Sequence, residues 1–300
     1  MTETSTGAPA NEPAAAGQSA TPRSSLSPSR AGDFMTCPLL YRLRVIDRIP
    51  EKPSRAAVRG TVVHQVLEDL FDLPAHARTL EQAQTMLPDA WHKVQQDEPD
   101  LAESLFPEQA DVQDWLNSAL PLLETYFTLE DPSRLEPAER ELHVEVTLDD
   151  GLVLRGFVDR LDKTPAGDMR IVDYKTGKAP GAGYEQKALF QMRFYALVIW
   201  KSTGVMPRLL QLLYLGSGHV IRYEPDAVDL ESTERKIRAL WSAINAAYET
   251  GDWRPNRSRL CDWCDFQRFC PEFGGTPPEL PVGLVPTSAP PAQTTDDVSG

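Results

Sequence analysis

Two short segments carry carboxylates at a spacing that suits chemistry on a phosphate group. They read GFVDRLD over 156–162 and IVDYKTG over 171–177, with a turn at 164–168 between them. If the chain folds back at this turn, the numbers of facing residues sum to about 332. Asp159 then faces Asp173, and Lys175 shares the face of Asp173 because side chains alternate along a strand. Asp162 has the opposite parity and should point away.

Two carboxylates that face each other across a sheet repel. Apolar neighbours, among them Phe157 and Val172, predict a buried sheet in which unpaired charge is costly. A divalent cation would turn the repulsion into attraction, and a lysine on the same face can orient or deprotonate water. The pattern predicts metal-assisted phosphodiester hydrolysis. Asp-x-Lys alone also fits a solvated hairpin with ordinary surface charges.

The elements around these segments predict an α/β fold. The first half is mainly helical, beginning at a capped start at Ser27-Pro28. Further helices are expected over 60–71, 80–96 and 109–129, broken by Pro88 and by the stretch 99–107. Alternating apolar residues then predict strands over 141–148, 152–161 and 169–174. A helix over 185–202, a hairpin over 209–223 and a helix over 227–250 follow.

The two ends of the chain predict disordered tails. Residues 1–25 and 274–300 are rich in small residues and proline, so one domain over 26–273 is expected. The N-terminus lacks the basic start and apolar core of a signal peptide. The sequence contains no run of about 18 apolar residues, so no membrane span is predicted. The expected compartment is the cytoplasm.

The four cysteines are spaced for a metal centre. Cys37 lies far upstream, and Cys261-x2-Cys264-x5-Cys270 is compact. Disulfides are not expected in the cytoplasm. Four thiolates suit a [4Fe–4S] cluster or structural zinc, and the spacing alone does not choose between them.

The net charge of −14 counts against a simple nucleic-acid binder. The tails account for −1 and −3, so the middle keeps −10. A DNA path must then be a local basic strip, or a partner must help to hold the substrate. The candidates for such a strip are two groups, Arg42, Arg44, Arg48 and Arg55, and the set Arg254, Arg257, Arg259, Arg268 with Trp253, Trp263, Phe266 and Phe269.

The two carboxylate segments resemble the RecB-like branch of the PD-(D/E)XK nuclease superfamily. Two further segments share the resemblance, RGTVVH over 59–64 and QMRFYAL over 191–197, and all follow the family's order. The resemblance implies a restriction-endonuclease-like mixed sheet flanked by helices and a DNA nuclease that uses Mg²⁺ or Mn²⁺. Iron–sulfur members of this branch, including AddB and CRISPR-associated RecB-like nucleases, share one upstream cysteine and a C-terminal trio. This layout implies a [4Fe–4S] cluster held as a clamp by Cys37, Cys261, Cys264 and Cys270, with zinc as the alternative.

The resemblance also implies roles for the site residues. The side-chain metal ligands would be His64, Asp159 and Asp173, and the carbonyl of Tyr174 would be a further ligand. Lys175 would be the catalytic lysine. Gln191 and Tyr195, one helical turn apart, would contact substrate or support Lys175. A lone helical histidine is more often a packing residue, so His64 depends on the motif order, with Glu68 one turn later as a possible orienting partner.

The sequence therefore predicts a metal-dependent DNA exonuclease of repair or recombination, acting on single strands or ends. Two alternatives stay open. One is a nuclease-fold DNA-binding or scaffold subunit that acts with a helicase, since no phosphate-binding Gly-x4-Gly-Lys-Ser/Thr loop is present. The other is a CRISPR spacer-processing nuclease.

Overall fold

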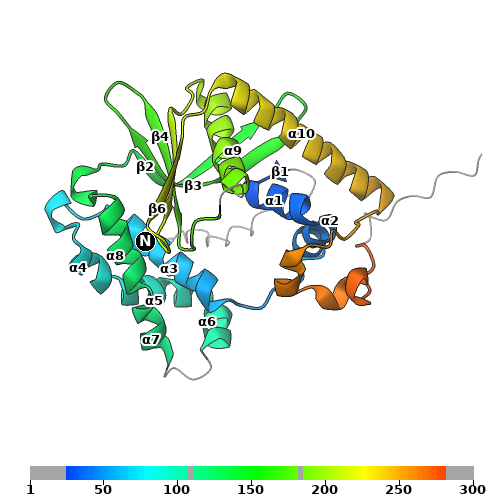
Figure 1. The fold of residues 1–300 in the computed structure, drawn as a ribbon, viewed down its shortest axis with the longest axis horizontal. Coiled ribbons are helices and arrows are strands. Elements are labelled where there is room, and N and C mark those ends of the chain that lie inside the picture. The colour runs from blue at the N-terminus through cyan, green and yellow to red at the C-terminus, as the bar shows by residue number, and fades with distance from the viewer. Residues whose placement is uncertain (1–24, 107–110, 182–184, 282–300) are drawn as a thin grey trace, which may run out of the picture.

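A central mixed sheet with helices on both faces organises the protein. The computed structural model describes residues 25–106, 111–181 and 185–281 (Figure 1). Within them the sheet has six strands, namely β1 (Ser25–Leu26), β2 (Glu139–Thr147), β3 (Val153–Lys163), β4 (Met169–Lys175), β5 (Leu209–Tyr214) and β6 (His219–Tyr223). This confirms the predicted α/β class with a restriction-endonuclease-like mixed sheet.

Strand β3 has two neighbours along one of its edges, because β1 and β4 pair with different parts of it. β3 pairs along its length with antiparallel β2, and on its other side with β1 at its start and β4 at its end. The β3–β4 ladder pairs Arg160 with Val172 and Lys163 with Met169, which is the predicted register. β5 lies parallel to β4, and β6 closes the sheet as an antiparallel hairpin.

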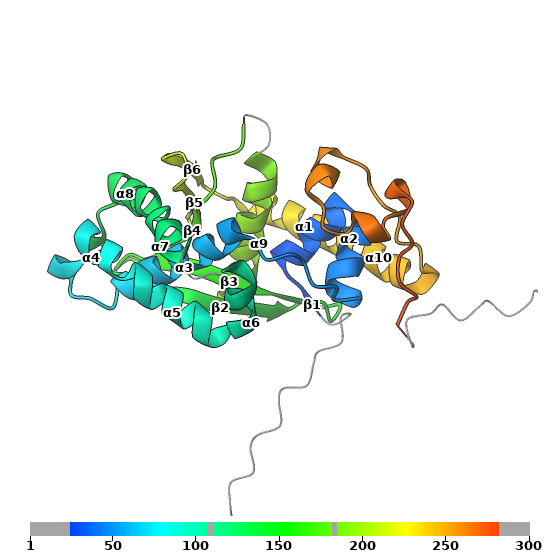
Figure 2. The same ribbon diagram turned by 90° about the horizontal axis from the view of Figure 1, so that it is seen from below.

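Helices near both ends of the chain cover one face of the sheet. They are α1 (Pro28–Thr36), α2 (Pro38–Tyr41), α9 (Glu185–Thr203) and α10 (Ala227–Thr250), with a π-helical turn at Arg42–Ile46. α9 is the crossover between parallel β4 and β5, and α10 packs against it. Figure 2 shows the C-terminal segment in orange beside α1 and α2. Its 3-10 turns are Arg259–Trp263, Gln267–Phe269 and Pro271–Phe273.

The middle helices cover the opposite face. They are α3 (Arg55–Leu70), α4 (Leu80–Thr85), α5 (Leu87–Asp97), α6 (Pro99–Leu105), α7 (Val112–Asn117) and α8 (Leu120–Leu129), with 3-10 turns at Ala75–Ala77 and Pro132–Arg134. Alternation along the strands feeds both cores, because Ile171 and Leu212 belong to the α9 side and Val172 and Leu213 to the α3 side.

Caps and prolines account for the helix limits that the sequence predicted well. The Ser27 hydroxyl accepts from the Arg30 amide at the start of α1. Pro88 lies in the first turn of α5, which begins at Leu87, and the predicted helix over 80–96 is divided there as expected. α10 has the predicted bounds because Asp226 caps its start and Gly251, with φ 70°, ends it. α3 starts five residues before the predicted position, at a Ser54 cap.

The described chain stays in contact with the core after residue 273. Arg42 donates to the carbonyl oxygen of Pro278, and Leu280 packs against the core on the α9 side. The predicted disorder of 1–24 and 282–300 lies outside the described residues. None of the helices described is long and apolar enough to cross a membrane.

A buried ion pair stands behind the end of β4. Arg160, only 1% exposed, donates to both carboxylate oxygens of Glu130 at 2.8 and 3.0 Å and to the Tyr174 hydroxyl at 2.7 Å. Gln211 of β5 also donates to Glu130. The network therefore ties β3, β4 and β5 together below the predicted site.

Replacing Arg160 with methionine is expected to lower the free energy of unfolding by about 3–5 kcal/mol, because Glu130 would stay buried without its partner. Urea denaturation measures this loss. Arg222→Met, on an exposed position of β6, is the control and should unfold like the wild type. Adding Glu130→Leu to Arg160→Met should recover part of the stability, and an Arg160→Met protein as stable as the wild type would contradict the expectation.

Candidate active site

The β3–β4 ladder stops where the predicted carboxylates begin. Its last pair is Arg160 with Val172, directly before Asp159 and Asp173. Beyond it, the amide of Tyr174 donates to Oδ2 of Asp159 at 2.7 Å. The side chain of Asp159 thus takes the place of a strand partner and is fixed beside β4.

The neighbouring strand β2 is distorted at the same level. The residue numbers of each β2–β3 pair add up to 300, as in Arg140 with Arg160. This register places Glu141 opposite Asp159. Glu141 has φ 42°, which is uncommon for a residue with a long side chain. Such a conformation persists only where the surroundings impose it, and it is frequent at functional sites.

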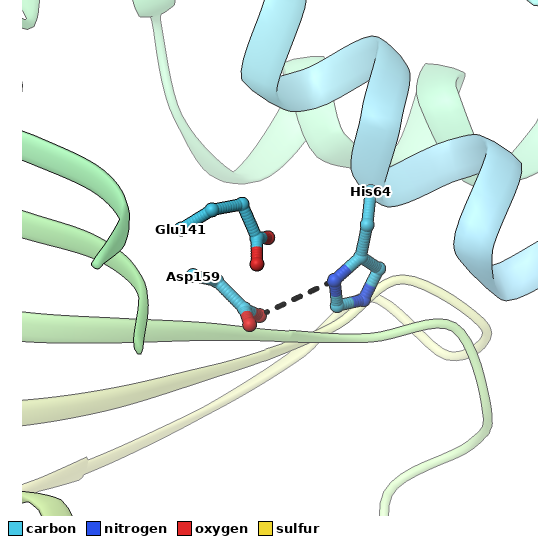
Figure 3. A group of neighbouring side chains, drawn as sticks. All are labelled: His64, Glu141 and Asp159. Carbon is cyan, nitrogen blue, oxygen red and sulfur yellow. Dashed lines mark ion pairs between the residues drawn. The ribbon is translucent and has the colours of Figure 1, made fainter. Parts of the chain in front are cut away.

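Helix α3 supplies the third donor. A Cβ on Gly60 would lie 3.0 Å from Oγ1 of Thr176, so glycine allows α3 to approach the end of β4 closely. His64 follows one turn later, and its Nδ1 lies 3.5 Å from Oδ2 of Asp159 (Figure 3). Ligand atoms of His64, Glu141 and Asp159 all lie within 4.8 Å of one another.

Glu141 was missed by the sequence reasoning. The same hairpin arithmetic that paired Asp159 with Asp173 would have found it, because the turn at 149–151 also fixes the register between β2 and β3. Glu68, considered as an orienting partner of His64, instead accepts a hydrogen bond from Gln65 at 3.2 Å.

The ionisable side chains of His64, Glu141 and Asp159 have shifted pKa values that suit cation binding. Burial, and then the charge of Asp173, raises the pKa of Asp159. Burial, and then Asp159, raises the pKa of Glu141 to about 7. Burial lowers the pKa of His64, which favours the neutral imidazole that can bind a metal. Two destabilised carboxylates and a neutral imidazole within 4.8 Å fit a divalent cation.

A second group of side chains lies next to these donors. Nζ of Lys175 is 2.6 Å from Asp173 and donates to Oε1 of Gln191 at 3.0 Å. The side-chain Nε2 of Gln191 donates to Asp173 at 3.1 Å and to the Tyr195 hydroxyl at 3.2 Å. Burial alone would lower the pKa of Lys175, but the attraction and hydrogen bond of Asp173 raise it, so Lys175 is an ammonium. The structure thus brings Asp173, Lys175, Gln191 and Tyr195 together.

Glycines make this close assembly possible. A Cβ on Gly156 of β3 would lie 2.6 Å from the ring of Tyr195. A Cβ on Gly216 would lie 2.7 Å from the backbone of Gly177. A Cβ at either position would be too close to its neighbour. Glycine therefore allows α9 to pack directly on β3, and it allows the β5–β6 turn to pack on the backbone that follows β4.

An open cleft of about 670 Å³ exposes part of this assembly to solvent. Its lining includes Gly60, His64, Glu68, Glu141, Tyr174, Lys175 and Tyr214. Tyr174 lines it too, but its hydroxyl accepts from Arg160 on the far side, so only its backbone remains as a predicted ligand.

The four cysteines meet at the opposite end of the α9 side. Cys37 lies between α1 and α2, and all four line one pocket with Leu39, Leu43 and Phe266. Burial raises the pKa of Cys264, and the charges of the other three thiols add to this shift. The amide of Asn256 points to Sγ of Cys37 at 3.3 Å and that of Ser258 to Sγ of Cys261 at 3.3 Å. The structure therefore joins the N-terminal and C-terminal segments at these thiols.

Several of the arginines considered for a DNA-binding strip form ion pairs with acidic side chains. Arg42 pairs with Asp47 at 3.0 Å, and Arg44 pairs with Asp33 and Glu51 at 2.5 Å each. Of the aromatic residues near the cysteines, Trp253 and Phe266 are core residues, whereas Trp263 is 78% exposed. Near the cysteines, Arg254 pairs with Asp252 at 2.8 Å and Arg257 with Glu272 at 3.8 Å, so several arginines of both groups lie beside acids.

Glu141→Gln is expected to stabilise the protein in EDTA at pH 8.5. A carboxyl whose pKa is raised on folding destabilises the fold above that pKa, and the penalty vanishes as the pH falls towards its ordinary value of 4.5. The gain should be on the order of 1–2 kcal/mol, discounted for partial exposure. Thermal melts of both proteins at pH 8.5 and pH 5 measure it, and the difference should shrink at pH 5.

In excess Mn²⁺ the wild type should melt at a higher temperature than Glu141→Gln, because the variant lacks one cation donor. Glu145→Gln, an exposed change on the same strand, should alter neither melt. A Glu141→Gln protein that is no more stable than the wild type in EDTA at pH 8.5 would show that this carboxylate carries no such strain.

Comparisons with known proteins bear on the whole described chain. Residues 25–271 match the family profile of the PD-(D/E)XK nuclease superfamily. The "Gene 69 protein" of Mycobacterium phage D29 is 25% identical over 273 residues, covering 82% of this chain and 96% of that protein. The protein of the same name from Mycobacterium phage L5 is 23% identical over 285 residues, with the same coverage.

A solved structure shares the fold. It is a protein of Eubacterium rectale described as a candidate exonuclease, with a TM-score of 0.53 and 13% identity. The match covers 81% of this chain and 87% of that one. With the family match over 25–271, the mixed sheet and the convergent carboxylates and lysine, the chain belongs to the PD-(D/E)XK nuclease superfamily.

Proposed function

We propose that the protein is a deoxyribonuclease of the RecB-like branch that requires Mg²⁺ or Mn²⁺. The observation that carries this proposal is the meeting of a cation donor group and a charged lysine at one solvent-exposed cleft. Membership of a nuclease superfamily makes the reaction hydrolysis of a phosphodiester bond.

Each side chain then has a part in the reaction. His64, Glu141 and Asp159 would hold a divalent cation, which would supply Lewis-acid stabilisation of the charge on the scissile phosphate. Asp173 and the carbonyl of Tyr174 would be further donors, as the resemblance to the RecB-like branch implies. The ammonium of Lys175 can donate to a phosphate oxygen and offset the charge that develops there.

Gln191 holds the lysine in place. It accepts from Lys175 while it donates to Asp173 and to Tyr195, so it fixes both ends of the Asp173–Lys175 pair. Tyr195 is fixed in turn against Gly156. The lysine therefore cannot swing freely into solvent, and little reorganisation is needed when a phosphate arrives.

We infer exonuclease action in DNA repair or recombination. The resemblance to the RecB-like branch supports it, as does the fold shared with a candidate exonuclease. The net charge of −14 supports a helicase or repair partner that delivers the DNA. A cytoplasmic location belongs to the same proposal.

The cysteine pocket supports a [4Fe–4S] cluster over zinc. Among the described residues, no three of the four sulfur atoms lie within 4.8 Å of one another. Tetrahedral Zn–S bonds of about 2.3 Å would bring the sulfurs to roughly 3.8 Å apart. A cluster that binds one thiolate on each of four irons suits wider spacing, and the two amides directed at sulfur suit bound thiolates.

The test is degradation of end-labelled single-stranded and duplex DNA by anaerobically purified protein, with Mg²⁺, Mn²⁺ or EDTA. Loss of label that requires a divalent cation, with short products from one end, is the expected result. Covalently closed circular DNA should survive an exonuclease. A folded protein that carries its metal centre and cleaves neither DNA would favour the scaffold alternative, and adding a helicase would then be the next step.

A further inference from the structure

A second hollow of about 470 Å³ lies beside the candidate active site. Gly156 and Tyr195 line this hollow, and the hydroxyl of Tyr195 accepts from the side chain of Gln191, which also donates to Asp173 in the active site. The other lining residues come from the start of α1 and from β2 and β3, and they include Ser27, Arg30, His143, Arg155 and Phe157.

Phe157 is unusual for a residue in the middle of the longest strand. Its side chain is 57% exposed, whereas Leu154 and Val158 on the other face are fully buried. This corrects the expectation that Phe157 belongs to the buried sheet. The ring of His143, which faces it from β2, lies 5.1 Å away. The fold gains little from an exposed phenylalanine, so the ring is available to a ligand.

The charges around the ring are positive. Arg155 precedes Phe157 by two residues, and the cation donor Asp159 follows it by two, a step of roughly 6.6 Å along a strand. The guanidinium of Arg30 donates to the carbonyl and hydroxyl of Ser25. Over the part of the chain that the structure describes, neither arginine forms an ion pair within 4.0 Å. Glu145 faces Arg155 from β2 and is the acid nearest to it in the sheet register.

We propose that this hollow binds a nucleotide of single-stranded DNA next to the scissile phosphate. The base stacks on Phe157, and the phosphate beyond it lies between Arg155 and Arg30. A duplex covers the faces of its bases, so only an unpaired base can stack there. The inference rests on the proposed nuclease function and adds the form of the substrate. The hollow is linked to the active site through Tyr195 and Gln191, and its charge complements a phosphate strand in an otherwise acidic protein.

The binding of labelled oligothymidylate to the protein in EDTA tests the subsite without any reaction. Phe157→Ala should weaken binding about tenfold, because stacking on an aromatic residue contributes that order per base. Phe157→Trp should bind like the wild type. Arg155→Ala should also weaken binding and should reduce the slope of log affinity against log salt by about 0.7, the value for one phosphate of a single strand.

Two control variants test surface changes of the same kind elsewhere. Val228→Ala removes an apolar side chain that is 68% exposed, and Arg235→Ala removes an exposed arginine of α10. Both should bind oligothymidylate like the wild type. Blunt duplex DNA should bind Phe157→Ala and the wild type equally, because its bases are stacked within the helix.

Hydrolysis of bis(p-nitrophenyl) phosphate with Mn²⁺ separates this proposal from the nuclease itself, because that diester has no neighbouring nucleotide. Phe157→Ala should keep the wild-type rate on it while its KM for oligothymidylate rises. Unchanged affinity and salt slope in both Phe157→Ala and Arg155→Ala, with a cleaving wild type, would overturn the subsite alone. A wild type that hydrolyses no diester, but whose DNA binding depends on Phe157, would overturn the nuclease and keep the subsite.

Discussion

Asp173→Asn and Lys175→Met should each reduce DNA cleavage by roughly 10²–10³-fold at saturating substrate. Lys175→Met removes the ammonium that offsets charge developing on the phosphate, and a single such donor is worth about 10²–10³ in kcat. Asp173→Asn removes a charged candidate cation donor and the carboxylate that holds this ammonium in place. Each also breaks the 2.6 Å contact between the two residues. Single-turnover cleavage of end-labelled DNA with Mn²⁺ measures the loss.

The fold should survive both changes. Asp173→Asn preserves shape and the hydrogen bond from Gln191, so its thermal melt in EDTA should lie near that of the wild type. Lys175→Met leaves the buried Asp173 without its cation, so it should melt lower but still fold. The matched controls are Asp168→Asn and Lys163→Met, on exposed positions of the same hairpin. Their cleavage rates should match the wild type. An Asp173→Asn protein that keeps a tenth of the wild-type rate would show that the reaction does not depend on this site.

Cys261→Ser should cause the largest loss of stability in the chain. The proposed metal centre would join segments 224 residues apart, between Cys37 and Cys261, so it would constrain a very long loop of the unfolded chain. The free energy of metal binding is in part free energy of folding. A loss of several kcal/mol should lower the melting temperature by about 10–20 °C at 2–4 °C per kcal/mol.

Metal analysis and the visible absorbance of anaerobically purified protein should be read beside the melts. The wild type should contain about four irons per chain, and Cys261→Ser should contain fewer and lose its colour. Ser258→Ala is the control, because it alters the same turn through a hydroxyl that caps Leu260 and leaves all four thiols in place. One zinc per chain and no iron would replace the cluster with a structural zinc site. A Cys261→Ser protein with wild-type metal content and melting temperature would show that the thiols hold no centre.

The register of the site could be predicted from the sequence because a short turn fixes it. The turn at 164–168 sets the pairs of β3 with β4, so the order of residues alone places Asp159 beside Asp173. Helix limits followed in the same way from local caps such as Asp226 and Gly251. Phe157 could not be placed, because a strand pattern shows alternation but not which face another element covers.

The sequence by itself determined the chemical types at this site, the order of the elements and the register of the hairpin, since these depend on residues near one another in the chain. Only the tertiary structure decided that His64 of α3 meets Glu141 and Asp159 of the hairpin to form one donor group. It also decided that Cys37 meets the C-terminal trio and that β1 and β4 pair only with the two ends of β3. These features follow from the closing of long loops around a shared core, and local propensity carries no information about that closure.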